Sequence, residues 1–416
     1  MTAAENARKV SAVLRREGWG GVAERLARRA SKRWGGDSEP MYLQAADVVD
    51  SATVRIPPAR TARAPGEALT VGWVLTAPGP ASGGHTTIFR FVEAVEAAGH
   101  RCILYLYDGQ GGSAQQYQEL IRTWWPRVRA EVRDVGALGT PGENVDAFVA
   151  TAWPTAHILA GRNDVPGVRF YLVQDFEPYF YPRGSAYELA EDTYRFGFIP
   201  LTVGRMVAAE LQDRFGAEPI VAEFGCDRER YSVTEHASRD AVIFYAKPGT
   251  ARRGYELGLM ALQLFHQANP TVQIHTFGVA ARRLPFPAVV HGHMSPTELN
   301  TLYNRCGAGL ALSFTNISLI AFELLAAGVT PVVNDSAGTR ADLSNPHIAW
   351  TRPTPRAVAE ALEIALASHR IAGPDALAAS VAEVSWAPAQ ATVLQAIEGA
   401  CRRPRTNAPH TAGGRL

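Results

Sequence analysis

The chain has 416 residues, of which 47% are hydrophobic and 19% charged, and its 41 lysines and arginines nearly balance 40 aspartates and glutamates. This composition is typical of a globular protein and excludes a largely disordered chain, and the length predicts two or three hydrophobic cores. The four cysteines are too widely spaced for a zinc motif or a disulfide framework, which favours a reducing compartment.

The amino-terminal 35 residues carry an excess of six positive charges. Residues 3–33 predict a basic amphipathic helix, interrupted by glycines, that can lie on an anionic membrane or dock as a solvated helix on its own protein. A signal peptide and an apolar stretch long enough to span a bilayer are both lacking. We therefore expect a cytoplasmic protein, with residues 1–35 as a candidate for peripheral contact with the inner face of the plasma membrane, and no nucleic-acid partner.

A first series of strands and helices follows an irregular segment, so that residues 1–68 form an extension and residues 69–230 a domain. The apolar runs predict strands at 69–75, 102–108, 130–135, 147–151, 168–176, 197–203 and 219–223, with helices at 86–98, 115–125 and 204–215. Such alternation predicts a parallel sheet with helices on both faces.

A second series begins after polar residues 227–240 and predicts a domain over 240–385. Its strands are expected at 241–246, 271–278, 288–292, 307–313 and 330–335, and its helices at 254–267, 296–306, 319–327, 355–368 and 374–382. A last helix near 387–401, within 386–416, is expected to pack back on the first domain. The fold class predicted is α/β, with two doubly wound, Rossmann-like domains facing each other across a cleft.

Three loops that follow predicted strands carry groups suited to a phosphate. Gly83 and Gly84 let backbone N–H groups approach a ligand at the start of a helix, although an ordinary turn also uses glycine. Lys247, Arg252 and Arg253 place three cations within seven residues, enough to converge on a diphosphate.

The third loop runs from Ser313 to Ser318 and precedes an apolar helix, so that free N–H groups at the start of that helix can bind a phosphate. Glu323 lies five residues after Ser318, well into the expected helix, where its carboxylate can accept hydrogen bonds from sugar hydroxyls. The alternative for Glu323 is a first-turn glutamate that interacts with the helix dipole.

A competing motif predicts a dinucleotide site. The segment from Gly109 to Ala114 fits a loose G-x-G-x-x-A fingerprint after a strand, and Asp134 lies about 20 residues further on. Asp108 directly before the loop would repel a pyrophosphate, and the loop follows the second strand of its domain. An NAD(P)-dependent oxidoreductase is thus an alternative prediction.

These landmarks, in this order, resemble GT-B glycosyltransferases of the family-4 kind over about residues 69–400. The resemblance is densest between Tyr171 and Asp335, where TFG is followed by HGHMSPTELNTLYNRCGAGLALSF, and EFGCDRERY is similar to the interdomain N-G-V-D-x-x-x-F turn. The segments YLVQDFEPYFYP and SFTNISLIAFELLAAGVTPVV resemble rhamnosyltransferases of bacterial surface-polysaccharide assembly that use dTDP-L-rhamnose.

The resemblance implies a retaining transfer of a sugar from a nucleotide-diphosphate donor to a glycan or lipid-linked acceptor, with no metal and no other cofactor. It implies that Lys247 and Arg252 hold the diphosphate and that Glu323 matches the second glutamate of an E-x7-E motif. It also implies that three residues offer N–H groups to the phosphate: Asn316, Ile317 and Ser318. Thr315 stands in place of the first glutamate. That departure leaves a non-catalytic, carbohydrate-binding GT-B-like subunit as a further alternative.

Two carboxylates near the end of the strand at 168–176 are candidates for acceptor chemistry. Asp175 or Glu177 can orient or deprotonate an acceptor hydroxyl, unless they are capping or ion-paired acids at a strand end. The nearby aromatic residues can offer flat surfaces to sugar rings or form the edge of a core: Phe176, Tyr179, Phe180 and Tyr181.

Overall fold

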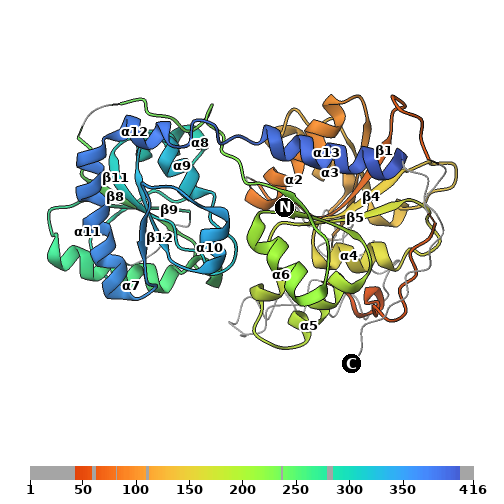
Figure 1. Ribbon diagram of the computed structural model, residues 1–416, viewed down its shortest axis with the longest axis horizontal. Helices are drawn as coiled ribbons and strands as arrows, with labels where there is room; N and C mark the ends of the chain where they lie inside the picture. The colour runs from red at the N-terminus through yellow and green to blue at the C-terminus, as the bar shows by residue number, and fades with distance from the viewer. Residues whose placement is uncertain are drawn as a thin grey trace, which may run out of the picture. The chain divides into compact units, whose positions relative to one another are not determined.

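The computed structural model describes residues 43–58, 62–80, 82–108, 112–235, 238–278 and 284–402. Within them the chain divides into two compact units, each with a central sheet flanked by helices (Figure 1). The first unit holds residues 43–172, 183–201 and 393–402, and the second holds 173–182 and 202–392. The predicted basic helix at 3–33 lies outside the described residues.

The larger sheet has seven strands in the order β3-β2-β1-β4-β5-β6-β7. Strands β1 to β5 pair in parallel, as their buried apolar runs predict. The strands are β1 (Thr70–Thr76), β2 (Arg101–Tyr107), β3 (Glu131–Asp134), β4 (Ala147–Ala150), β5 (Val168–Val173), β6 (Ile199–Val203) and β7 (Ile220–Ala222). The accompanying helices are α2 (Gly83–Ala97), α3 (Ala114–Trp124), α4 (Trp153–Ala160), α5 (Ser185–Asp192) and α6 (Arg205–Phe215).

The described residues before β1 are irregular apart from a short 3-10 turn, η1 (Ala45–Asp47), yet hydrogen bonds tie them to the first unit. Ser51 bonds to Asp192 through both its backbone N–H and its hydroxyl. The last helix, α13 (Ala387–Arg402), enters the first unit from Val393 onward. There its Glu398 contacts His100 at 3.1 Å.

The smaller sheet is wholly parallel and has the order β10-β9-β8-β11-β12-β13. Numbered within each sheet, both sheets share the doubly wound order 3-2-1-4-5-6, and the larger one adds a seventh strand. The second set of strands is β8 (Ala241–Ala246), β9 (Ile274–Gly278), β10 (Val289–Val290), β11 (Cys306–Leu310), β12 (Thr330–Asn334) and β13 (Ala349–Thr351). Its helices are α7 (Tyr255–Ala268), α8 (Pro296–Tyr303), α9 (Ile320–Ala326), α10 (Ala337–Asp342), α11 (Pro355–Ala372) and α12 (Pro374–Ala379).

Side chains of β8 alternate between two hydrophobic cores, one on each face of the smaller sheet. Val242, Phe244 and Ala246 pack in the core that α7 and α11 cover. Ala241 and Ile243 pack in the core that α8, α9 and α12 cover. A strand period of two with helices on both faces gives the three-layer packing predicted from the sequence.

The structure adds four elements that the apolar pattern did not predict: α4, α5, α10 and β13. Helix α4 is buried along almost its whole length, so its sequence shows no amphipathic period. Helix α10 and strand β13 are only six and three residues long. The signal available for α10 was its capping box, in which Ser336 accepts from the Thr339 N–H.

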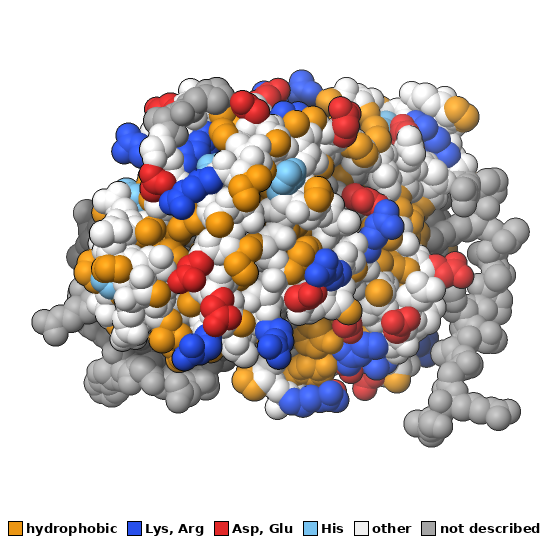
Figure 2. All heavy atoms as spheres, turned by 60° about the vertical axis from the view of Figure 1, so that its left-hand side comes forward, with side chains coloured by type: hydrophobic (Ala, Val, Ile, Leu, Met, Phe, Trp, Pro, Cys, Tyr) orange, Lys and Arg blue, Asp and Glu red, His pale blue; other side chains and the backbone are white. Residues whose placement is uncertain are grey.

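The surface shown in Figure 2 carries basic and acidic side chains that are interspersed and form no large area of one sign. Among the described helices, none combines the length and the apolar character that crossing a bilayer requires.

Candidate functional site

The second sheet brings two of the predicted phosphate loops together at the point where its strand order reverses. Strands β8 and β11 are neighbours although they are not consecutive, and the loops after them hold Lys247–Gly254 and Ala311–Leu319. Ligands of open α/β sheets bind at such a reversal, beyond the carboxyl ends of the strands. A backbone hydrogen bond of 2.9 Å from Phe314 N to Arg252 O joins the two loops.

Asn334, which was not predicted from the sequence, holds the loop at 313–318 in place. Asn334, at the end of β12, accepts a hydrogen bond of 2.7 Å from Ser313 N and donates one of 2.7 Å to Ser313 O. The Ser313 hydroxyl donates to Asn316 O. Both Ser313 and Asn334 are buried. The sequence contained a signal for Asn334, because it is a polar residue at the end of an otherwise apolar strand. The neighbouring strand, β11, leads into the loop at 313–318.

Arg253 links the loop at 247–254, the cationic loop, to the loop at 313–318. Its guanidinium donates to the Ser313 hydroxyl at 2.6 Å and approaches Asn316 Oδ1 at 3.4 Å. Burial lowers the pKa of this guanidinium to about 10, while the Asp175 carboxylate opposes the change. The turn continues through Gly254, whose φ of +62° puts the backbone in the left-handed region.

Lys247 and Arg252 occupy different surroundings within the same loop. Lys247 is exposed, and the pKa of its ammonium group is lowered, first by partial loss of solvent and then by Arg252 and Arg253. Arg252 is 28% exposed and lies over the ring of Phe180, with its Cζ 4.0 Å from the ring centroid. Two guanidinium groups close to an ammonium group create a positive potential suited to a multiply charged anion.

The segment 173–182, which belongs to the second unit, inserts a carboxylate between these loops. Asp175 Oδ2 accepts a hydrogen bond of 2.8 Å from the Thr315 hydroxyl and lies 3.5 Å from Arg252 Nε. Asp175 Oδ1 accepts from Asn316 N at 3.2 Å and from Phe176 N at 2.9 Å. Burial is the largest influence on the Asp175 carboxyl and raises its pKa, against the effect of the two guanidinium groups.

The remaining residues of this segment only partly match the expectations for an acceptor surface. Glu177 is buried at the start of a short 3-10 helix, η3 (Glu177–Phe180). Phe176 is fully buried, so its ring belongs to a core and the idea that it presents a surface to a sugar is wrong. Tyr179 is 41% exposed and donates to Glu210 at 3.0 Å.

Glu323 lies in the first turn of α9, because the helix begins at Ile320. The expectation that Glu323 sits well into its helix is therefore wrong, and the alternative of a first-turn glutamate describes its position. The Tyr303 hydroxyl approaches Glu323 Oε2 at 3.3 Å. The side chains of Asn316, Ile317 and Ser318 are all buried, and the Asn316 N–H is already engaged by Asp175.

Gly83 and Gly84 belong to the first unit, whereas the loops just described belong to the second. They form the exposed first turn of α2, and a Cβ atom built on Gly83 would meet nothing within 4 Å. The next residue, His85, is fixed by contacts of 2.9 Å to Ser82 Oγ and to Thr76 O. Burial lowers the pKa of His85.

The competing dinucleotide site is only partly covered by the described residues. Residues 109–111 of the competing dinucleotide loop lie outside the described residues. Asp134 accepts a hydrogen bond of 2.8 Å from Gly136 N and caps a 3-10 turn. No group of three or more histidine, cysteine, aspartate or glutamate side chains suited to a metal ion occurs in the described part of the chain.

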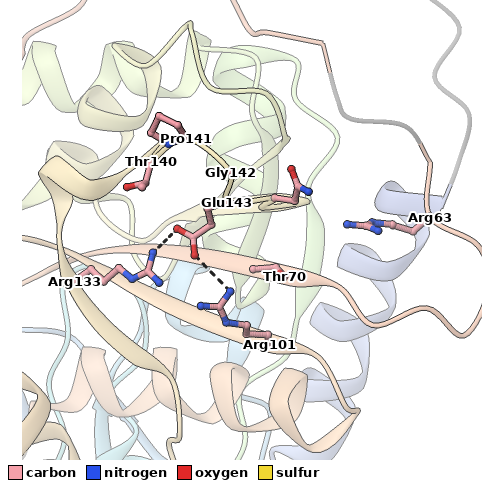
Figure 3. A pocket seen from close by; sticks show the side chains of 9 residues that line it. Arg63, Thr70, Arg101, Arg133, Thr140, Pro141, Gly142 and Glu143 are labelled. Atoms are coloured by element: carbon pink, nitrogen blue, oxygen red, sulfur yellow. Dashed lines mark hydrogen bonds and ion pairs between the residues drawn. The ribbon is translucent and has the colours of Figure 1, made fainter.

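A pocket of about 470 Å³ in the first unit has a different chemical character (Figure 3). Thr70 and Arg101, which line it, begin β1 and β2, so it lies at the amino ends of those strands. Arg101 and Arg133 both point at Glu143, and Arg63 forms an ion pair with Asp146. The arginines of this pocket are paired with carboxylates, and it lies at the opposite ends of the strands from the usual ligand site. We therefore do not include it in the candidate functional site.

Two parts of the chain are similar to described domain families. Residues 240–363 match the model described as the C-terminal domain of WsaF, and residues 137–203 match that of the N-terminal domain of WsaF. The O-antigen biosynthesis protein RfbC of Myxococcus xanthus is 30% identical over 345 residues, or 78% of this chain. The chain spans 26% of the length of that relative.

Solved structures of low sequence identity share the fold. Sucrose-phosphate synthase of Thermosynechococcus elongatus has a TM-score of 0.56 at 12% identity, covering 80% of this chain and 96% of that one. WaaG, a glycosyltransferase involved in lipopolysaccharide biosynthesis, has a TM-score of 0.57 at 12% identity, with coverages of 79% and 100%. Anabaena HepE in complex with UDP-glucose has a TM-score of 0.56 at 13% identity, with coverages of 80% and 97%. The chain thus has the GT-B fold, which confirms the predicted fold class.

Proposed function

We propose that this chain is a glycosyltransferase that moves a sugar from a nucleotide-diphosphate donor to a hydroxyl group of a glycan or lipid-linked acceptor in surface-polysaccharide synthesis. The observation that carries the proposal is the convergence of Lys247, Arg252 and Arg253 with the loop at 313–318, at the reversal point of the second sheet. The similarity to the O-antigen biosynthesis protein RfbC supports a role in polysaccharide synthesis, and the fold shared with the glycosyltransferase WaaG is consistent with the reaction class.

The proposed transfer requires positive charge close to the bond of the donor that breaks. Cleavage of the anomeric bond develops negative charge on the departing diphosphate, so a fixed ammonium group and fixed guanidinium groups stabilise the transition state more than the ground state. These cations belong to the chain itself, so the step that we propose draws on them and on no metal. Attack by the acceptor hydroxyl on the face that the diphosphate leaves would retain the anomeric configuration.

L-Rhamnose, carried by dTDP, is the sugar that we propose. The support is the resemblance of residues 171–182 and 313–333 to rhamnosyltransferases of polysaccharide assembly. In this chain Thr315 replaces a glutamate of the related motif, and its hydroxyl faces Asp175. A hydroxyl in place of a carboxylate changes what the pocket can offer to sugar hydroxyl groups, which suits a deoxysugar.

The test combines nucleotide binding with transfer. Calorimetric titration of the full chain with dTDP, UDP, GDP and NAD should show binding of a pyrimidine nucleoside diphosphate. Lys247→Ala should weaken that binding about tenfold or more. Arg370→Ala is the matched control, because Arg370 is an exposed cation of the same unit that pairs with Asp240 at the surface. Equal affinities of wild type and Lys247→Ala would remove the phosphate assignment.

The alternatives give different results in the same assays. An oxidoreductase that uses residues 109–114 would bind NAD and no nucleoside diphosphate. A non-catalytic carbohydrate-binding subunit would support polysaccharide assembly in cells even when both Lys247 and Glu323 are replaced by alanine.

A further inference from the structure

The Asp175 carboxylate contacts both the cationic loop and the loop at 313–318 through the bonds described above. Each of its carboxylate oxygens has two neighbours that carry positive charge or donate a hydrogen bond: Asn316 N and Phe176 N at Oδ1, and the Thr315 hydroxyl and Arg252 Nε at Oδ2. The side chain is 8% exposed. This is the coordination that a bound anion receives in a phosphate site.

The partners of Asp175 are also groups that the proposed function assigns to the donor diphosphate. Arg252 and the Asn316 N–H can each serve the carboxylate or a phosphate oxygen, and Arg253 influences Asp175 electrostatically. Two anions that share the same cations repel each other, more strongly in a partly buried site than in water. We propose, on the basis of the proposed function, that Asp175 is an internal counter-ion that sets the geometry of these loops and weakens the hold on the diphosphate.

The counter-ion would act unequally on the donor and on the product. A free nucleoside diphosphate carries about one more negative charge than its sugar ester near pH 8, because its terminal phosphate ionises again with a pKa of about 6. Repulsion by a fixed carboxylate therefore raises the free energy of the bound product more than that of the bound donor. Asp175 thereby favours release of the nucleoside diphosphate after transfer.

This role differs from the general base predicted from the sequence. A base must accept a proton from the acceptor, but both Asp175 oxygens already accept hydrogen bonds from Thr315, Asn316 and Phe176. Asp175 is thus a positioning residue that acts through charge. Its effect is expected on nucleotide affinity and on product inhibition.

Asparagine is a suitable replacement because the hydrogen bonds can be kept while the charge is removed. Its Oδ1 can accept from the N–H groups of Asn316 and Phe176. Its Nδ2 stands where Oδ2 stood and can donate to the Thr315 oxygen, since a hydroxyl group accepts as well as donates. The change therefore separates loop positioning from charge.

The experiment is calorimetric titration of the full chain with dTDP, UDP and the matching sugar nucleotides at pH 8. We expect Asp175→Asn to tighten dTDP or UDP roughly tenfold and the sugar nucleotide roughly threefold. Asp342→Asn is the control, because Asp342 is a carboxylate of the same unit that accepts N–H groups of Arg205 and Met206, which belong to neither loop. It should leave both affinities unchanged.

The outcomes separate this inference from the proposed function. If wild type binds no nucleotide, the proposed function fails. If wild type binds but a folded Asp175→Asn binds the diphosphate equally or more weakly, or tightens both ligands by the same factor, the inference is wrong. Asp175→Ala, checked for folding by circular dichroism, serves in the same titration if the asparagine variant does not fold, and the same differential tightening is expected.

Discussion

The Thr315 hydroxyl donates a hydrogen bond of 2.8 Å to Asp175 Oδ2, and both residues are buried. The two lie 140 positions apart in the sequence. A buried carboxylate needs such donors, because water cannot solvate it there. The stability of the loop at 313–318 is therefore coupled to the segment 173–182 through this bond.

Thr315→Val should destabilise the second unit. The substitution keeps the β-branched shape but removes a donor from a carboxylate with little access to solvent, and an unsatisfied buried group costs about 1–3 kcal/mol. For a unit of this size the thermal midpoint should fall by about 3–10 °C. Differential scanning calorimetry measures the change.

The control for this substitution is Thr301→Val. Thr301 is exposed, and its hydroxyl donates to Thr297 O within helix α8. The thermal midpoint of Thr301→Val should change by much less than that of Thr315→Val. A Thr315→Val midpoint equal to that of wild type would show that the carboxylate does not depend on the hydroxyl.

The stability difference between wild type and Asp175→Asn should depend on pH with a definite sign. Burial raises the pKa of Asp175 above its ordinary value of 3.8. The contribution of this carboxyl to stability is then fully present below pH 3.8 and is lost as the pH rises through the raised pKa. Asp175→Asn should therefore melt above wild type at pH 7–8, and the advantage should shrink as the pH approaches about 4.

Asp335→Asn provides a contrast of opposite sign. Hydrogen bonds from Arg340 lower the pKa of Asp335, so its contribution is present above its ordinary pKa and is lost as the pH falls. Thermal midpoints of the three proteins between about pH 2 and pH 8 measure both trends, because the Asp335 contribution is lost only below its ordinary pKa. A gap between wild type and Asp175→Asn that stays constant over this range would contradict the raised pKa.

The meeting of the two candidate phosphate loops could be predicted from the sequence, because their position depends on strand order. Lys247–Gly254 follows the first strand of the second series and residues 311–319 follow the fourth. A doubly wound sheet makes those two strands neighbours, so the loops meet at one edge. Local apolar runs and cation spacing were sufficient for this part of the site.

The partners of those loops could not be predicted in the same way. Asp175 follows a strand of the larger sheet, yet its carboxylate contacts Thr315 and Arg252, because residues 173–182 pack within the second unit. Neither hydropathy nor spacing encodes that tertiary contact. The start of α9 at Ile320 also depends on backbone geometry, since no side-chain cap at Leu319 marks it.

Gly225, in the turn EFGCDRERY, should tolerate no larger residue. A Cβ atom at this position would lie 2.6 Å from Ser385 C and 2.6 Å from Trp386 N, which are backbone atoms that cannot rotate away. Gly225→Ala should therefore force this turn away from residues 385–386, at a cost of about 2–3 kcal/mol. Gly399→Ala is the matched control, because a Cβ atom there meets nothing within 4 Å and the helix α13 should gain about 0.5–1 kcal/mol. Urea denaturation followed by circular dichroism measures both changes, and an unaltered Gly225→Ala midpoint would contradict the close approach of the two backbones.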